Sequence, residues 1–132
     1  MVCLDAIWRR EWGAAEVPAF RALMDQEHGG ESWVSDGNFA QATFDIRLPR
    51  ADLIVWLERP RLLCATRAVL RVFRSGEAHR LGDVAKVLRF IWGFDRINRP
   101  RIEALIEQYG RHIPLVRLRT EADIERFVAE AA

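Results

Sequence analysis

The apolar positions of this chain follow two patterns, short continuous runs and longer stretches in which they recur every third or fourth residue. The short runs predict strands, and they cover residues 2–4, 32–35, 52–57 and 113–118. The helical spacing predicts helices over residues 16–28, 61–74, 81–94, 98–109 and 121–131. Strands that alternate with helices are typical of a parallel sheet with helices on its faces, so the pattern predicts an α/β fold.

Several residues predict where these elements begin and end. Asn98 suits a helix start and Gly110 a helix stop, while Thr120 with Asp123 predicts a capping box for the last helix. Residues 37–50 have a mixed pattern, which indicates a loop with a turn or two of helix. The run at 52–57 is continuously apolar, as expected of a strand that is covered on both faces.

The length of 132 residues predicts a single domain. No apolar run approaches the roughly 18 residues of a membrane span, and the N-terminus lacks the pattern of a signal peptide, so we expect a cytoplasmic protein. Cys3 and Cys64 are too few for a disulfide framework and too sparse for a zinc site, so they predict buried reduced thiols. The three histidines lack metal-ligand spacing and are interpreted as surface residues; they are His28, His79 and His112.

The positive charges are unevenly distributed. The net charge is only +1, yet residues 47–101 hold thirteen Lys and Arg against five Asp and Glu. Of the twenty basic residues all but Lys86 are arginines, whose planar fork grips phosphate or carboxylate at two points. The middle of the chain therefore suits anion binding. The alternative is a solvated helix face in a chain with an arginine-rich composition.

Polar residues also collect where two predicted strands end. Asp36, Gly37 and Asn38 follow one run, and residues 58–60 follow the next. In open parallel sheets ligands bind outside the carboxyl ends of the strands. The stretch from Trp33 to Arg71 is therefore where a site is expected.

This chain resembles the bacterial topology modulation proteins, a family of small P-loop proteins related to adenylate kinase. The resemblance extends over nearly the whole chain and rests on LDA at 4–6, WVSDGNF at 33–39, DIRL at 45–48, ADLIVWLERPR at 51–61, Cys64, Arg67, RP at 99–100 and LVRLR at 115–119. It implies a three-layer fold, a parallel sheet covered by helices, of the P-loop nucleotide-kinase type. It also implies ATP and Mg²⁺ as cofactors and phosphoryl transfer from a nucleoside triphosphate to a small acceptor, or hydrolysis.

One part of the family pattern is absent from this sequence. Members begin with a strand, a Gly-rich loop and a helix, but no G-x-x-x-x-G-K-[ST] occurs in these 132 residues. That loop cradles the phosphates, and its Lys and Ser or Thr reach the terminal phosphoryl group and Mg²⁺. We therefore expect this chain to bind no nucleotide and to lack the parent activity.

By the resemblance, the absent strand lies in the middle of the sheet, between the strands at 32–35 and 52–57. Its loss would leave two edges with unpaired backbone groups. The chain could close into a four-stranded sheet, form a homodimer by borrowing a strand from a second copy, or be a fragment whose start lies upstream. The last of these is the hypothesis we favour.

The resemblance assigns roles to acidic and amide side chains. Asp36 is implied to be catalytic and to assist Mg²⁺ through a water; alternatively it starts an Asx turn before Gly37. Asp5 is implied to face the phosphoryl acceptor, with pairing to a nearby arginine as the alternative, and Asn38 to bind substrate.

Arginines and one tryptophan complete the set of candidates. Arg67 and Arg71 are implied to be catalytic, since they would neutralise a transferring phosphoryl group; alternatively they lie on a solvated or ion-paired helix face. The remaining implied roles are substrate binding for Arg47 and Trp8, and a reduced lid around residues 75–80 flanked by Arg74 and Arg80. Trp33 and Trp56 are interpreted as core residues.

Two other function classes stay open. A degenerate member of the family could keep the arginine-lined pocket, bind a small anionic or phosphorylated molecule or a partner chain, and perform no chemistry. A DNA-associated role is suggested by the family's name alone, and the near-neutral charge argues against direct nucleic-acid binding. No feature of the sequence predicts a membrane partner.

Overall fold

The computed structural model describes residues 1–7, 14–74 and 81–131. Its residues group into two compact units, which are described here one at a time. The first unit is Met1–Asp52 with Arg101–Pro114, and the second unit is Leu53–Pro100 with Leu115–Ala132. Whether they act as the single domain that the length predicts stays a prediction.

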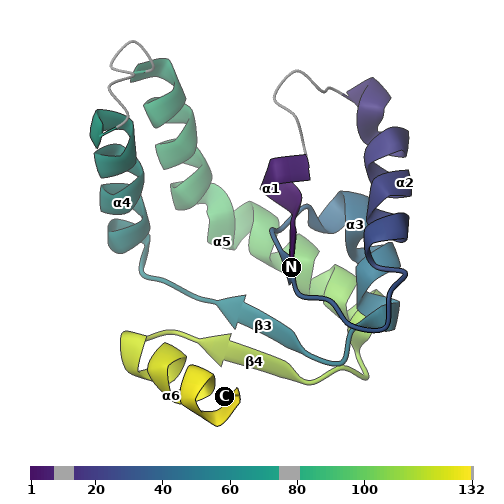
Figure 1. The fold of residues 1–132 in the computed structure, drawn as a ribbon. Helices are drawn as coiled ribbons and strands as arrows, with labels where there is room; N and C mark the ends of the chain where they lie inside the picture. The colour runs from purple at the N-terminus through teal and green to yellow at the C-terminus, as the bar shows by residue number, and fades with distance from the viewer. Residues whose placement is uncertain (8–13, 75–80, 132) are drawn as a thin grey trace. The chain divides into compact units, whose positions relative to one another are not determined.

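The first unit contains two short strands and several helices (Figure 1). In chain order its elements are β1 (Val2–Cys3), α1 (Leu4–Ile7), the 3-10 turn η1 (Ala14–Glu16), α2 (Val17–Glu27), β2 (Ser35–Asp36), α3 (Ala40–Arg47) and the 3-10 turn η2 (Leu48–Arg50). Strands β1 and β2 pair in parallel, with Val2 opposite Ser35 and Cys3 opposite Asp36.

The second unit contains the other strand pair (Figure 1). Its elements are β3 (Ile54–Leu57), α4 (Arg61–Arg74), the start of α5 (Leu81–Gly110), β4 (Leu115–Leu118) and α6 (Glu121–Ala131). Strands β3 and β4 pair in parallel over four residues, from Ile54 opposite Leu115 to Leu57 opposite Leu118. Two parallel strand pairs with helices between the strands make the fold α/β, as predicted.

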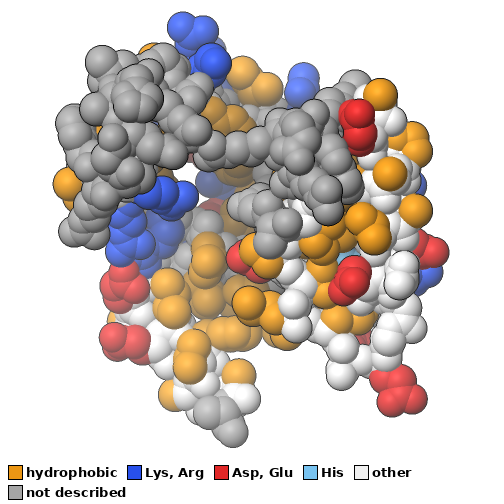
Figure 2. Space-filling view, turned by 45° about the horizontal axis from the view of Figure 1, so that its top comes forward, with side chains coloured by type: hydrophobic (Ala, Val, Ile, Leu, Met, Phe, Trp, Pro, Cys, Tyr) orange, Lys and Arg blue, Asp and Glu red, His pale blue; other side chains and the backbone are white. Residues whose placement is uncertain are grey.

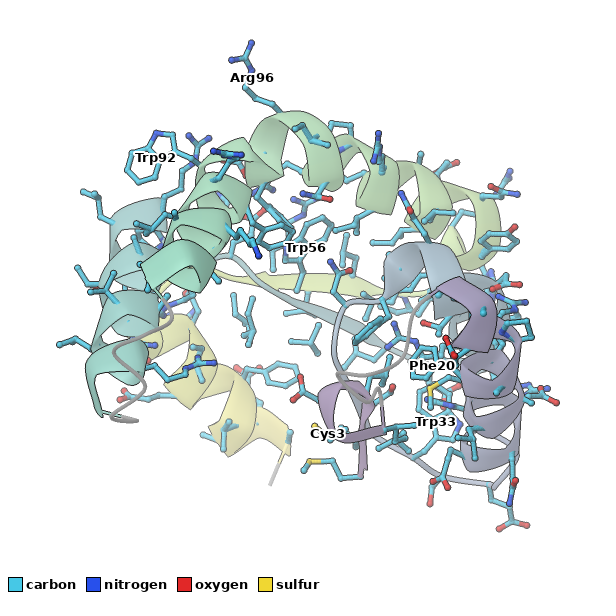
Figure 3. All side chains as sticks on the ribbon, turned by 90° about the horizontal axis from the view of Figure 1, so that it is seen from above. Cys3, Phe20, Trp33, Trp56, Trp92 and Arg96 are labelled. Carbon is cyan, nitrogen blue, oxygen red and sulfur yellow. The ribbon has the colours of Figure 1, made fainter. Side chains whose placement is uncertain are left out.

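Most of the described buried apolar side chains lie in the first unit. Val2, Leu4, Phe20 and Met24 form its central cluster, and α2 packs against α3. Trp33 packs against this cluster as predicted, and Figure 3 shows Phe20 and Trp33 on the same side of α2. Complete burial of a side chain such as Phe20 stabilises by roughly 2–3 kcal/mol, so this cluster holds β1, α2 and the β2 loop together.

His28 belongs to this core, and its prediction as a surface residue is wrong. The side chain is buried, its Nδ1 lies 2.6 Å from the carbonyl of Met24, and its ring meets Trp33 edge-on. The isolated position of His28 in the sequence gave no sign of this. Burial follows because α2 ends at Glu27 and turns the next residue back toward Trp33.

The second unit is much less buried. Leu118 is its one residue among the described buried apolar side chains, and α6 has none. Along β3 the exposure alternates, with Val55 and Leu57 41% and 59% exposed. The prediction that this strand is covered on both faces is therefore wrong for the described residues. On α5, Trp92 and Arg96 point away from the helix (Figure 3).

The predicted element boundaries are confirmed for most of the chain, and the differences lie at β2, at Leu4 and in α5. The strand expected at 32–35 is shorter, β2 at Ser35–Asp36; Val34 before it is 67% exposed, and its carbonyl accepts from the Val2 N–H at 2.6 Å. Leu4, expected at the end of a strand, starts α1 instead. Residues 37–50, predicted as a loop with a turn or two of helix, contain the eight-residue helix α3 and then the 3-10 turn η2, which includes Pro49, so this prediction is confirmed. The predicted capping box of α6 is confirmed, with Thr120 and Asp123 exchanging hydrogen bonds of 2.9 and 3.1 Å.

The two helices predicted at 81–94 and 98–109 are one continuous helix, α5, so Asn98 is not a cap. Pro100 lies inside it and removes one backbone hydrogen bond. Across the expected break, Arg99 Nε donates to Asp95 Oδ1 at 3.0 Å, an i,i+4 ion pair that favours helix. No helix among the described residues is long and apolar enough to cross a membrane.

The glycine after β2 should be essential to the first unit. Gly37 has φ +127°, and a Cβ built on it would lie 2.8 Å from Cβ of Leu4. We expect Gly37→Ala to lower the free energy of unfolding by about 2–3 kcal/mol, because strain and a clash with the core add together. Urea unfolding followed by circular dichroism would measure the change.

Gly30→Ala is the matched control for that substitution. A Cβ at Gly30 would meet nothing within 4 Å, so stability should hardly change. Equal effects of the two substitutions would contradict the strained conformation at Gly37.

Candidate anion-binding site

In the first unit, Arg47 holds the loop that carries Asp36 and Asn38. Its Nη1 donates to Ser35 Oγ at 3.2 Å and to the Gly37 carbonyl at 3.1 Å, and its Nη2 donates to the Asn38 carbonyl at 2.5 Å. Its Nε donates to Thr43 Oγ1 at 3.0 Å. Four of the five guanidinium N–H groups are thus committed to the protein, which leaves Asp36 and Asn38 exposed at the end of β2.

The guanidinium of Arg47 is buried among neutral partners. Burial lowers the pKa of Arg47 to about 10, which still leaves it charged at neutral pH. An uncompensated buried cation attracts negative charge. Its implied role in substrate binding stays a prediction. Three of its N–H groups donate to the 35–38 loop and one to Thr43, so the contacts of Arg47 in the structure shape that loop.

In the second unit, Glu58 follows β3 and accepts hydrogen bonds from three arginines. Arg117 Nη1 and Arg119 Nε each lie 2.7 Å from its carboxylate, and Arg99 Nη1 also pairs with it. Arg117 and Arg119 stand two residues apart around β4, so both reach the same side of the strand pair. Glu58 is therefore the point at which β3, α5 and the end of β4 are joined.

These arginines lower the pKa of Glu58 and contact the ring of Trp56. The hydrogen bonds from Arg99, then Arg119 and Arg117, lower the pKa of Glu58 to about 2. The guanidinium carbons of Arg99 and Arg117 also lie 5.4 and 4.8 Å from the ring centre of Trp56, within cation–π range. Trp56 is half-buried between them, so its predicted place in the core is only partly met.

A second carboxylate, Asp95, extends the arginine network along α5. Arg61 Nε donates to it at 2.9 Å, and Arg99 joins it to Glu58. These hydrogen bonds lower the pKa of Asp95, that from Arg61 most. The start of α4 is thus fixed to α5 through ion pairs.

A third carboxylate, Glu121 at the start of α6, lies between Arg59 and Arg67. Its Oε1 accepts from Arg59 Nη2 at 2.5 Å and lies 3.4 Å from Arg67 Nη2. The Arg59 side chain is 14% exposed and that of Arg67 60%. Within the described part of the chain, Arg59 Nε and Nη1 are buried and have no hydrogen-bond partner.

We call these residues the arginine cluster; it comprises Arg59, Arg61, Arg67, Arg99, Arg117 and Arg119 around Glu58, Asp95 and Glu121. Figure 2 shows basic side chains gathered directly against acidic ones on one face. Among the described residues the cluster brings six guanidinium groups to three carboxylates, so these side chains include more cations than anions. Because it lies at the carboxyl ends of two parallel strands, an anion is the ligand that its charge and position favour.

The other candidate residues have different surroundings. Arg71 on α4 is exposed, and no partner for it is seen in the described residues. Asp5 lies in α1 and Arg74 ends α4, while the side chains of both fall outside what the structure describes, as do Trp8, Arg80 and the predicted lid at 75–80. No group of three metal-binding side chains is found within residues 1–7, 14–74 and 81–131.

The sequence reasoning missed most of the cluster. Of its arginines only Arg67 was predicted as a site residue, because no local pattern distinguishes the other five from solvated surface arginines. The signals that could have found them were the Glu58-Arg59-Pro60 segment after a strand and the alternating Arg117 and Arg119 in the last strand. Neither signal says which carboxylate each arginine meets.

Comparison with known proteins adds no assignment. No protein-family model matches this chain, and no curated protein or solved structure gives a significant match.

The stability of the second unit should depend on the charge of Glu58. Its pKa is lowered from 4.5 to about 2, which corresponds to roughly 3 kcal/mol. This contribution is present above pH 4.5 and is lost as pH falls through 2, because the unfolded chain takes up the proton first. Glu58→Gln should therefore be less stable than the wild type at pH 7, and the difference should vanish between pH 4.5 and 2.

Urea unfolding at a series of pH values would measure this difference. Glu130→Gln, on the exposed end of α6, is the control and should show no such convergence. A constant gap between Glu58→Gln and wild type down to pH 2 would contradict the ion-paired carboxylate.

Proposed function

We propose that the arginine cluster binds a small phosphorylated molecule, as the acceptor-side half of a phosphoryl-transfer domain. The observation that carries the proposal is the gathering of guanidinium groups at the carboxyl ends of β3 and β4. Of these, Arg59 has Nε and Nη1 without a hydrogen-bond partner in the described part of the chain. Arginine matches the geometry of phosphate because its fork donates two parallel hydrogen bonds. Arg67 and Arg71, which lie on the same helix, are the cations that would contact the ligand from its solvent side.

The fold that we propose for this function is the P-loop kinase type, with a three-layer parallel sheet. Both strand pairs are parallel and both are joined through helices, which fits this topology. Asp36 would assist a water-bound Mg²⁺, and the exposed carboxylate at the end of β2 fits that role.

These residues by themselves should not transfer phosphate from ATP. The sequence lacks G-x-x-x-x-G-K-[ST], so nothing cradles the terminal phosphates and no P-loop Lys or Ser holds them with Mg²⁺. We expect no Mg²⁺-dependent saturable binding of ATP and no ATP hydrolysis by the purified chain. Calorimetric titration with ATP and Mg²⁺, with a phosphate-release assay, would test this; tight binding that requires Mg²⁺ would overturn it.

A binding module that performs no chemistry is the second candidate function. It is favoured by the exposed apolar side chains of β3, Val55 and Leu57, which a partner chain or a second copy would cover. The two candidates share the anion site and differ in whether a nucleotide is ever used.

The anion site itself can be tested with inorganic pyrophosphate as the probe. Isothermal titration calorimetry at low ionic strength should show binding to the wild type, and Arg59→Ala and Arg67→Ala should each weaken it by about tenfold, since each removes a charged hydrogen-bond donor. Binding should weaken with added salt.

Arg50→Ala is the matched control for these variants. Arg50 is exposed and pairs with Asp25 in the first unit, so its loss should leave the affinity unchanged. If the three alanine variants weaken binding equally, the probe senses only the net charge and the proposed site is wrong.

A further inference from the structure

Glu121 is the one carboxylate in the arginine cluster that comes from α6, and it is held by two arginines from other segments. Arg59 lies in the loop after β3 and Arg67 on α4, yet both direct Nη2 at the same oxygen, Oε1. Two guanidinium groups that converge on one oxygen form the arrangement that proteins use to grip a phosphate. Here an internal carboxylate lies at that position.

This contact engages only the Nη2 group of each arginine. Glu121 presents one oxygen to them, while Nε and Nη1 of Arg59 are buried and unpaired among the described residues. Buried N–H groups without partners are costly. A phosphate group has several oxygens, so in place of Glu121 it could satisfy donors that the carboxylate leaves unpaired.

Glu121 can leave this position without unwinding its helix. The start of α6 is held by Asp123, whose Oδ2 accepts from the backbone N–H groups of Arg119 and Thr120 at 3.1 and 2.9 Å. Thr120 Oγ1 in turn accepts from the Asp123 N–H. The side chain of Glu121 is itself 61% exposed and takes no part in these bonds.

We propose that Glu121 is an internal competitor that occupies the anion site, and that a phosphate group displaces it by binding Arg59 and Arg67. This inference rests on the proposed function and names the regulation of that site. The bound form would have the phosphate against both guanidinium groups and Glu121 turned to solvent. The affinity of the resting protein is then set by this competition.

Calorimetric titration of pyrophosphate into the full chain tests this competition. Glu121→Gln keeps the size of the side chain and the cap of α6 but removes the charge, so it should bind pyrophosphate about fivefold more tightly than the wild type. Glu121→Ala is a second variant with the same expectation. Glu130→Gln, which makes the same change in net charge on the same helix, should leave the affinity at the wild-type value.

The outcomes separate this inference from the proposed function. If wild type and Glu121→Gln bind equally, or if Glu130→Gln tightens binding as much, the competition is refuted while an anion site that needs Arg59 and Arg67 stands. If neither wild type nor the Glu121 variants bind pyrophosphate, both are overturned. Combining Glu121→Gln with Arg59→Ala should abolish the gain, and a gain that persists would place the effect elsewhere.

Discussion

The carboxylate of Glu58 is the interaction on which the second unit depends. Few of its described apolar side chains are buried, so the hydrophobic effect alone holds its elements weakly. Glu58 joins the end of β3 to Arg99 on α5 and to Arg117 and Arg119 around β4, with its side chain only 10% exposed. Partly buried, charge-assisted hydrogen bonds of this kind are stronger than exposed ion pairs. Three of the six arginines of the cluster are positioned by this one group.

The arginines that form these ion pairs also make the cluster rich in positive charge. Among the described residues its side chains include more cations than anions, six guanidinium groups to three carboxylates. Arg59 and Arg67 are the clearest case, because they share a single oxygen of Glu121. In the function that we propose, the same arginines serve both structural ion pairing and anion binding, because Glu121 lies where the anionic group of a ligand would bind.

In both units arginines position polar groups at the carboxyl end of a parallel strand, but the surroundings of these arginines differ. In the first unit, Arg47 positions a loop at the end of a strand from within a packed core, where Phe20 and Met24 are completely buried. In the second unit, Arg99, Arg117 and Arg119 position Glu58 at the end of β3, in a strand pair that is half-exposed. Both arrangements place polar groups at the carboxyl end of a parallel strand, Asp36 in one and Glu58 in the other, which is the expected position for a ligand site.

The sequence by itself determined the α/β class, most helices and the cap of α6, because these follow from local periodicity and from residues close in sequence. It also predicted a site near the end of β3 and singled out Arg67, which lies in the arginine cluster. Only the tertiary structure decided that α5 runs through Pro100, that His28 is buried and that Glu58 meets Arg117 and Arg119. Those outcomes depend on contacts between distant residues, such as Glu121 with Arg59, and no local pattern specifies which charges will meet.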